Sequence, residues 1–189
     1  ILEVYDADDR IPWVVRRGEH LYNVWLDAEH PRGLWRRTTL AEYRTEDPVW
    51  EVLLDLDALA TAEDENWVWA GATFLPPAWD RCLVSLSRGG ADASVVREFD
   101  PVRREFVAGG FTLAEAKTNC TWIDADTVFV ATDRGPGSLT RSGYPRTVVR
   151  WSRGTPLETA EEVHAAQPDD MMVAAWRDHT SGVDLVEVR

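Results

Sequence analysis

Hydrophobic and polar residues alternate along most of this chain in short runs, which Gly, Pro and Asp residues separate. Runs of this length, rich in Val, Trp, Phe and Thr, are typical of β-strands. Helical spacing is scarce, and its best examples are "DALATAED" over Asp57 to Asp64 and "TLAEAK" over Thr112 to Lys117. The pattern therefore predicts an all-β chain with two short helices.

The predicted strands repeat in groups of four. They give three complete units and the start of another, over approximately residues 11–56, 66–108, 117–166 and 170–189. Four strands repeated at roughly 45 to 60 residues are typical of the blades of a β-propeller. We therefore expect residues 1–189 to form a partial β-propeller, an all-β fragment of about three four-stranded antiparallel blades plus the start of a fourth.

A β-sandwich also uses short strands, but it needs no internal repeat. Propeller blades stack face to face and bury both sides of their central strands, which explains apolar runs such as "TVFVAT" and the ten tryptophans. A ring with missing blades leaves apolar faces uncovered at its two ends. We therefore expect this chain to self-associate through its open blade faces, to adopt a compensating arrangement, or to be poorly soluble.

The net charge of −13 repels the phosphates of nucleic acids and anionic membrane surfaces, so neither is an expected partner. No run of about 18 apolar residues spans a membrane, no charged-then-apolar leader is visible, and a cytoplasmic location is expected. The two cysteines, Cys82 and Cys120, are too few for a disulfide framework, so we expect reduced, buried thiols.

The chain lacks a catalytic serine motif. A nucleophile elbow needs Gly two residues before and two residues after the serine, and no serine has both. In "GPGSLTRSG", which comes nearest, Ser138 and Ser142 are interpreted as parts of a loop between two strands. The four histidines are expected to be structural or solvated and are listed in chain order as His20, His30, His164 and His179.

Metal and cofactor sites are not expected either. The clusters "DADD" at Asp6 to Asp9 and "DAD" at Asp124 to Asp126 resemble fragments of calcium loops, but neither continues into a 12-residue loop with a terminal Glu. Zinc would need Cys and His pairs at short spacing, and the two cysteines stand apart.

The stretch "LWRRTTLAEY" is interpreted as the third strand of the first unit. Alternation would place Trp35 and Arg37 on one face and Arg36 on the other. Because both faces of a blade are packed, each arginine needs a carboxylate or carbonyl partner.

Six longer motifs, in this order and spacing, resemble the propeller of prolyl oligopeptidase-type serine peptidases, especially the bacterial members. They are "HPRGLWRRTTLAEYR", "PVWEVLLDLDALA", "ENWVWAG", "CLVSLSRGGADASVVREFD", "GFTLAEAK" and "GPGSLTRSGYPR", and the resemblance covers about Ile11 to Val188. It implies a parent protein in which a seven-bladed propeller covers an α/β-hydrolase domain with a Ser-Asp-His triad and restricts entry to short peptides. This chain would be the first half of that N-terminal propeller, without the catalytic domain, which would be its partner.

The resemblance also implies two residues that contact substrate in the intact parent. Phe74 falls on the family's phenylalanine position, counted back from "SLS". Cys120 falls on its cysteine position, counted on from Lys117, although this chain is one residue shorter before Trp122. The role implied for both is apolar contact at the mouth of the substrate pocket.

Three functions remain open at this point. The first is a non-catalytic, substrate-gating propeller of such a peptidase. The second is a stand-alone propeller that presents an acidic face to a basic protein partner. The third is a carbohydrate-active propeller whose tryptophans stack on sugars, although alternation such as Trp67 and Trp69 is also the ordinary way to bury one face of a strand.

Overall fold

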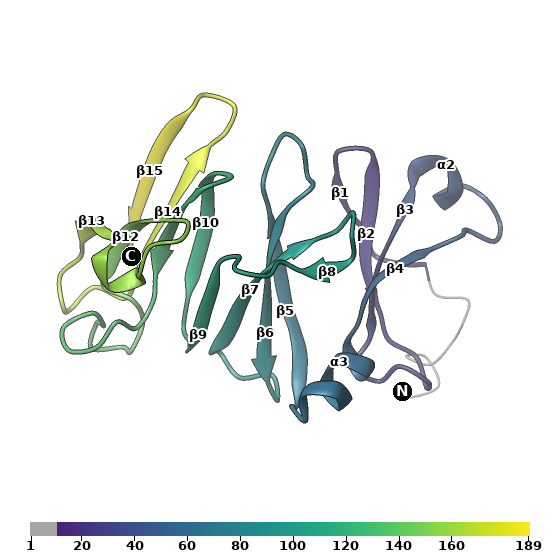
Figure 1. Ribbon diagram of the computed structural model, residues 1–189, viewed down its shortest axis with the longest axis horizontal. Coiled ribbons are helices and arrows are strands. Elements are labelled where there is room, and N and C mark those ends of the chain that lie inside the picture. Colours follow the sequence, from purple (N-terminus) through teal and green to yellow (C-terminus); the bar gives the residue numbers. More distant parts are fainter. Residues whose placement is uncertain (1–10) are drawn as a thin grey trace.

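A computed structural model describes residues 11–189, which form four β-sheets standing side by side (Figure 1). We call these sheets blade 1 to blade 4 in chain order. Their hydrogen-bonded strand pairs are all antiparallel, and neighbours in each sheet are mostly neighbours in sequence. The strands are, in blade 1, β1 Val15–Arg17, β2 His20–Trp25, β3 Leu34–Thr39 and β4 Glu51–Asp55; in blade 2, β5 Trp67–Phe74, β6 Cys82–Arg88, β7 Ser94–Asp100, β8 Glu105–Phe106 and β9 Thr112–Ala116; in blade 3, β10 Asn119–Asp124, β11 Thr127–Ala131, β12 Thr147–Ser152 and β13 Glu161–Ala165; and in blade 4, β14 Val173–Asp178 and β15 Val183–Val188.

This arrangement confirms the predicted fold class, an all-β propeller fragment of antiparallel blades. Blades 1 and 3 have the predicted four strands, blade 2 has a fifth strand, β9, which pairs with β7, and blade 4 has two strands. Helices are short: α2 Leu40–Tyr43, α3 Leu56–Glu63 and the single-turn η1 Leu157–Thr159. Within the residues that the structure describes, none of these helices is long and apolar enough to cross a membrane.

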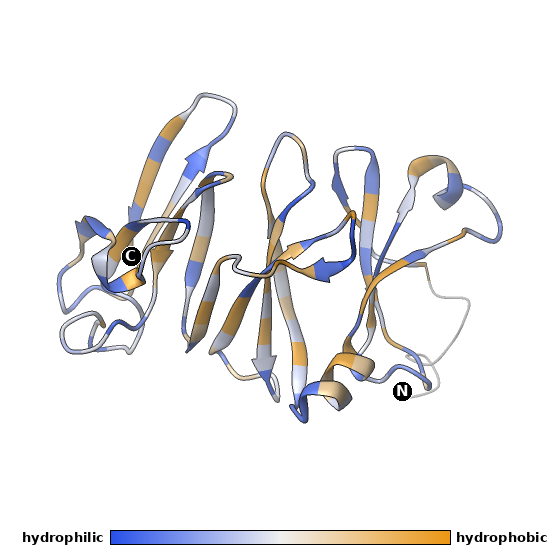
Figure 2. Ribbon diagram, in the orientation of Figure 1, coloured by the Kyte–Doolittle hydropathy of each residue, from blue (hydrophilic) through white to orange (hydrophobic). Residues whose placement is uncertain are grey.

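Each pair of neighbouring blades shares one hydrophobic cluster, and the strand pattern explains why. In β6, Cys82, Val84 and Leu86 pack toward blade 1, whereas Leu83 packs toward blade 3. Figure 2 shows hydrophobic residues recurring along the strands of every blade. Side chains of a strand point alternately to its two faces, so a central strand buried on both faces is apolar almost throughout.

The predicted helix at Asp57 to Asp64 is confirmed as α3, which links blade 1 to blade 2. The carboxylate of Asp55 accepts a hydrogen bond from the Ala58 N–H at 2.9 Å and caps the first turn. Asp64 ends the helix with a φ of +53°, a left-handed cap. Leu56 and Ala60 are buried against the cluster between blades 1 and 2.

The predicted helix at Thr112 to Lys117 is wrong, because Thr112–Ala116 forms strand β9. It pairs with β7, with Leu113 opposite Val96. Both side chains are buried in the cluster between blades 2 and 3. The burial of Leu113 in a sheet therefore outweighs the helical propensity of the short Ala- and Glu-containing run.

The third strand of blade 1 is shorter than predicted. It ends at Thr39, and the chain turns into α2. The hydroxyl of Thr39 accepts a hydrogen bond from the Glu42 N–H at 3.2 Å, so "TLAE" starts a helix in the manner of a capping box.

The two arginines in this strand do find partners, of different kinds. Arg37 donates from Nε to the Glu51 carboxylate at 2.6 Å, as predicted. Arg36 donates to the side-chain amide oxygen of Asn23 at 2.7 Å, and its guanidinium lies 4.5 and 4.3 Å from the ring centres of Trp25 and Trp50. The side-chain amide of Asn23 and the rings of Trp25 and Trp50 are therefore among the partners of Arg36.

Candidate functional site

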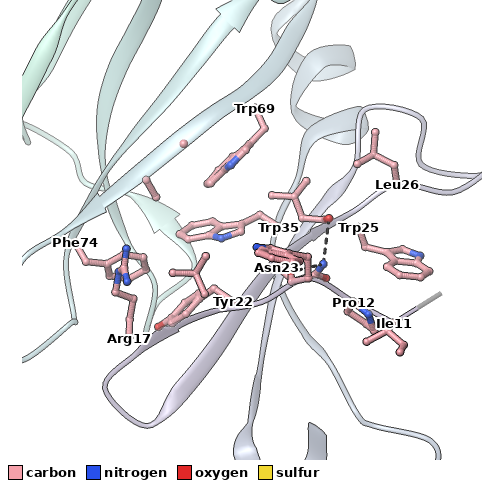
Figure 3. Close-up of a pocket in the computed structure, with 15 residues that line it drawn as sticks. Ile11, Pro12, Arg17, Tyr22, Asn23, Trp25, Leu26, Trp35, Trp69 and Phe74 are labelled. Carbon is pink, nitrogen blue, oxygen red and sulfur yellow. Dashed lines mark hydrogen bonds between the residues drawn. The ribbon is translucent and has the colours of Figure 1, made fainter. Parts of the chain in front are cut away.

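An aromatic pocket of about 570 Å³ lies between blades 1 and 2. Figure 3 shows its walls, which come from β1, β2, β3, β5 and the segment that precedes β1. Six aromatic side chains line it: Trp13, Tyr22, Trp25, Trp35, Trp69 and Phe74. Apolar pockets with a few polar groups are the usual form of binding sites for small ligands and peptides.

The wall on the side of blade 2 follows from an irregularity in β5. The pairing of β5 with β6 shifts register between Trp69 and Gly71, which marks a bulge. Gly71 has a φ of +137°, a conformation that other residues rarely adopt. The bulge leaves Trp69 on the pocket wall, where its ring centre lies 4.8 Å from that of Trp35.

Phe74 is the last residue of β5 and lies in the same pocket wall. Its ring centre is 4.8 Å from that of Tyr22 and 6.4 Å from that of Trp79. Burial raises the pKa of Tyr22, so its hydroxyl stays neutral and donates or accepts hydrogen bonds without charge. Phe74 is thus in contact with aromatic rings on this side.

Cys120 lies elsewhere. It is the second residue of β10 and is buried in the cluster between blades 2 and 3, together with Leu75 and Trp122. Burial raises the pKa of the Cys120 thiol well above its ordinary value, which makes it a poor nucleophile at neutral pH. The structure therefore places Phe74 and Cys120 in different clusters, on opposite sides of blade 2.

The loop after β5 packs beside Phe74 through Trp79, and the sequence reasoning did not single it out. Trp79, in "LPPAWD", has a φ of +58° and packs on the turn between β1 and β2. A Cβ on Gly18 in that turn would lie 2.8 Å from Cδ1 of Trp79, so glycine allows the close approach. The guanidinium of Arg17 lies 6.0 Å from the Trp79 ring centre.

The structure gives hydrogen-bond partners for His30, His179 and Ser138. Within residues 11–189, no hydrogen bond joins a histidine to a serine hydroxyl. His30 contacts the Asp27 carboxylate at 3.0 Å inside a turn, and the Nε2 of His179 lies 3.1 Å from the Trp122 carbonyl oxygen. The Ser138 hydroxyl is tied to its own loop, 2.7 Å from the Gly135 carbonyl oxygen.

Of the two acidic clusters, the structure describes Asp124 to Asp126, which stabilises a turn. Asp124 accepts the backbone N–H of Asp126 at 2.9 Å between β10 and β11. The other cluster, Asp6 to Asp9, lies outside the described residues. Over residues 11–189, no three Cys, His, Asp or Glu side chains gather as a metal site would require.

The buried tryptophans act mainly as core residues. Trp67, Trp122 and Trp151 belong to the clusters between blades, and each indole N–H is satisfied by an acceptor in the protein. A row of exposed sugar-stacking rings is therefore not formed by these three residues.

Comparison with known proteins agrees with this geometry. Residues 2–183 match the family described as the prolyl oligopeptidase N-terminal beta-propeller domain. The chain is 44% identical over 172 residues to an uncharacterized peptidase of Sinorhizobium fredii, covering 90% of this chain and 24% of that protein. It is 33% identical over 179 residues to one of Rickettsia prowazekii, covering 90% and 25%.

Solved structures show the same architecture. A post-proline cleaving enzyme from Rickettsia typhi superposes with a TM-score of 0.93 at 30% identity, over 99% of this chain and 29% of that chain. Oligopeptidase B from Leishmania major shares the fold, with a TM-score of 0.70 at 12% identity over 93% of this chain and 23% of that chain. The chain thus spans about a quarter of the length of the curated relatives. Because residues 2–183 match the family and the chain folds into propeller blades, this chain belongs to the prolyl oligopeptidase N-terminal β-propeller family.

Proposed function

We propose that this chain is the substrate-gating part of the propeller of a serine peptidase that cleaves short peptides. The observation that carries the proposal is the match along the whole chain to propellers of peptidases, together with its span of about a quarter of their length. Catalysis in the parent protein is assigned to a separate α/β-hydrolase domain with a Ser-Asp-His triad, which the propeller contacts.

The gating role would come from the position of the pocket. The first strand of each blade lies innermost in a propeller and lines its channel. Phe74 ends such a first strand, β5, and its ring lies in the aromatic pocket wall. We assign Phe74 an apolar contact with peptide substrate. The same role is not assigned to Cys120, because Cys120 lies in the cluster between blades 2 and 3 and does not line this pocket.

A domain exchange tests the proposal. The matching segment of the Rickettsia typhi enzyme would be replaced by this chain, and hydrolysis of a short proline-containing chromogenic peptide would be compared with digestion of a long unfolded protein. The exchanged enzyme should cleave the short peptide and spare the long chain. The isolated chain should cleave neither. Serine-dependent hydrolysis by the isolated chain, or free digestion of the long substrate by the exchanged enzyme, would contradict the proposal.

The residue-level part needs a separate comparison. Phe74→Ala in the exchanged enzyme should raise KM for peptides with apolar residues near the cleaved bond and leave kcat close to the starting value. Phe106→Ala is the matched control, because Phe106 is an aromatic residue on β8, outside the lining of the pocket. Equal changes in both variants would remove Phe74 from the proposed site.

A further inference from the structure

A second pocket, of about 780 Å³, lies between blades 2 and 3. One wall is formed by β9, and the other by the loop between β11 and β12, the start of β12, η1 and β13 (Figure 1). Every residue that lines it lies between Leu113 and Glu162, so blades 2 and 3 form it without the other blades. We call it the charged pocket, because Arg134, Arg146, Glu158 and Glu162 line it. Its volume is in the range of pockets that bind small ligands.

Arg134 is held only loosely in the wall of the charged pocket. Its Nε is buried and has no hydrogen-bond partner among residues 11–189. Its Nη2 donates to the Thr147 hydroxyl at 3.3 Å and lies 3.9 Å from a carboxylate oxygen of Glu162. By contrast, Arg153 and Arg97 donate to carboxylates at 2.7 and 2.9 Å. A buried donor on a charged group normally has a partner, and here an acceptor on a ligand would supply it.

Arg146 adds a second positive charge, which is held by neutral groups. Its Nε donates to the Gly137 carbonyl oxygen and its Nη1 to the Ala166 carbonyl oxygen, both at 2.9 Å. Carbonyl oxygens orient a guanidinium but leave it with its full charge. The loop between the two arginines turns at Gly135 and Gly137, both of which have a positive φ, and Arg134 and Arg146 line the same pocket. Two guanidinium groups in one pocket favour a carboxylate on the ligand.

The carboxylates of the pocket restrict the ligand further. Four acidic residues line it: Glu115, Asp133, Glu158 and Glu162. Glu115 accepts a hydrogen bond from Arg88 at 2.8 Å, and Asp133 accepts the Gly135 N–H at 2.9 Å. Glu158 and Glu162 are exposed, and their negative charges repel a phosphate and attract an ammonium group. A molecule with one carboxylate and one ammonium group fits this combination of charges.

We infer that the charged pocket binds a small zwitterion, such as a short peptide with free ends, whose carboxylate accepts from Nε and Nη2 of Arg134 and whose ammonium group lies near Glu158 and Glu162. Nε and Nη2 share one edge of the guanidinium, and a carboxylate accepts from two such groups in parallel. Because Nε is covered, the Arg134 side chain has to turn toward the pocket, and it gives up only its long contacts to Thr147 and Glu162. The inference stands without the proposed gating role, because the charged pocket shares no lining residue with the aromatic pocket.

Binding is measured on this chain, with no peptidase activity involved. The probe is the dipeptide Ala-Ala, and the readout is the arginine Nε–H signals of the ¹⁵N-labelled chain in NMR, with Arg134 assigned from the signal lost in Arg134→Gln. The Arg134 signal should move and saturate. Acetyl-Ala-Ala lacks the ammonium group and Ala-Ala-amide lacks the carboxylate, so each should bind at least several-fold more weakly. Inorganic phosphate at the same concentration should leave the signal in place.

Titration calorimetry compares the affinity of three variants for Ala-Ala. Arg134→Gln should weaken binding about ten- to a hundredfold, the range for a hydrogen bond to a charged group. Ala114→Phe, at an exposed position of β9 that lines the pocket, should abolish binding by filling it, even if Arg134→Gln fails to fold. Arg150→Gln is the matched control and should leave the affinity unchanged. Arg150 lies on β12 outside the lining, and its ion pairs to Glu161 and Asp184 are also long, at 3.8 and 3.5 Å.

Four outcomes would overturn the inference. They are an unmoved Arg134 signal at millimolar Ala-Ala, an equal affinity for Ala-Ala and either blocked peptide, tighter binding of phosphate than of Ala-Ala, and an unchanged affinity in Ala114→Phe.

Discussion

The carboxylate of Glu98 on β7 accepts hydrogen bonds from two guanidinium nitrogens of Arg153, which follows β12, at 2.7 and 3.1 Å. The Glu98 side chain is 0% exposed and also accepts the Phe111 N–H at 2.9 Å. Burial opposes the charge on Arg153, but hydrogen bonds from its guanidinium to Glu98 and Asp126 still hold its pKa above the ordinary value. This buried ion pair therefore joins blade 2 to blade 3.

Removal of the carboxylate should be strongly destabilising. Glu98→Ala leaves the Arg153 charge and the Phe111 N–H without their main partner, and breaking a buried pair in this way costs about 3–5 kcal/mol. Urea unfolding followed by tryptophan fluorescence measures the loss. Arg103→Ala is the control, because Arg103 is 75% exposed and its distance to Asp100 is 3.9 Å. That control should change the free energy of unfolding by less than about 0.5 kcal/mol; similar losses in both variants would mean that the Glu98 pair contributes little.

Gly18 should not tolerate a side chain. Gly18→Ala forces a Cβ against Trp79 and places alanine at a φ of +57°, so we expect a loss of about 1–3 kcal/mol in urea unfolding. Gly154→Ala is the control, because Gly154 has a similar φ of +74° and an added Cβ would meet no atom within 4 Å. The loss of stability in this variant therefore measures the backbone strain alone. The excess loss at Gly18 should disappear in a Trp79→Ala background. An excess that persists there would rule out the contact with Trp79 as its cause.

The buried thiols should make the chain less stable in alkaline solution. Burial raises the pKa of Cys82 and of Cys120, so both stay protonated in the folded state. In the unfolded state a thiol ionises near its ordinary pKa of about 8.5. Above that pH the folded state binds more protons than the unfolded state. The protonated thiols therefore stabilise the folded state fully below about pH 8.5, and the free energy of unfolding decreases as the pH rises further.

Urea unfolding at a series of pH values from neutral to alkaline measures this decrease. The Cys82→Ala and Cys120→Ala double variant should have a flatter profile just above the ordinary thiol pKa, although its overall stability will be lower. Native chain should also react slowly with a thiol reagent and rapidly after unfolding. A double variant with an equally steep profile would assign the decrease to other groups.

The open end of blade 4 should drive self-association. Val183, Leu185 and Val188 on β15 are 51%, 40% and 41% exposed, and no described strand pairs with the outer edge of β15. Unpaired, apolar edge strands are templates for further pairing. Light scattering after size exclusion should show a mass that rises with concentration. Leu185→Lys should lower that mass toward the monomer, whereas Val102→Lys, at an exposed turn, should not; a monomer at all concentrations would refute this prediction.

The repeat of four strands could be predicted from the sequence, because strands packed on one face alternate apolar and polar residues and central strands are apolar on both faces.

The two segments whose secondary structure was predicted wrongly have a common cause. Leu113 belongs to β9 and Leu40 to α2, and each lies in a short run whose state depends on its neighbours in space. The "TLAE" capping signal was present at Thr39, and it was hidden by the strand pattern that precedes it.

The site was less accessible to sequence reasoning than the fold. The sequence resemblance pointed to Phe74, and the pocket around that residue combines side chains of β1, β2, β3 and β5, of which β5 is far from the others along the chain. Nothing in the local sequence of Arg134 separates it from the other arginines. Only the three-dimensional partners of its guanidinium, and its place in a pocket built from two blades, distinguish it.

Each hydrophobic cluster joins only two adjacent blades: the first joins blades 1 and 2, the second blades 2 and 3, and the third blades 3 and 4. Stability in such a stack is a sum over nearest-neighbour interfaces, as in linear repeat proteins. The terminal blades have one interface each and the central blades have two. Slow amide hydrogen exchange should therefore be concentrated in β6 and β11, with opening that begins at the ends of the stack and moves inward.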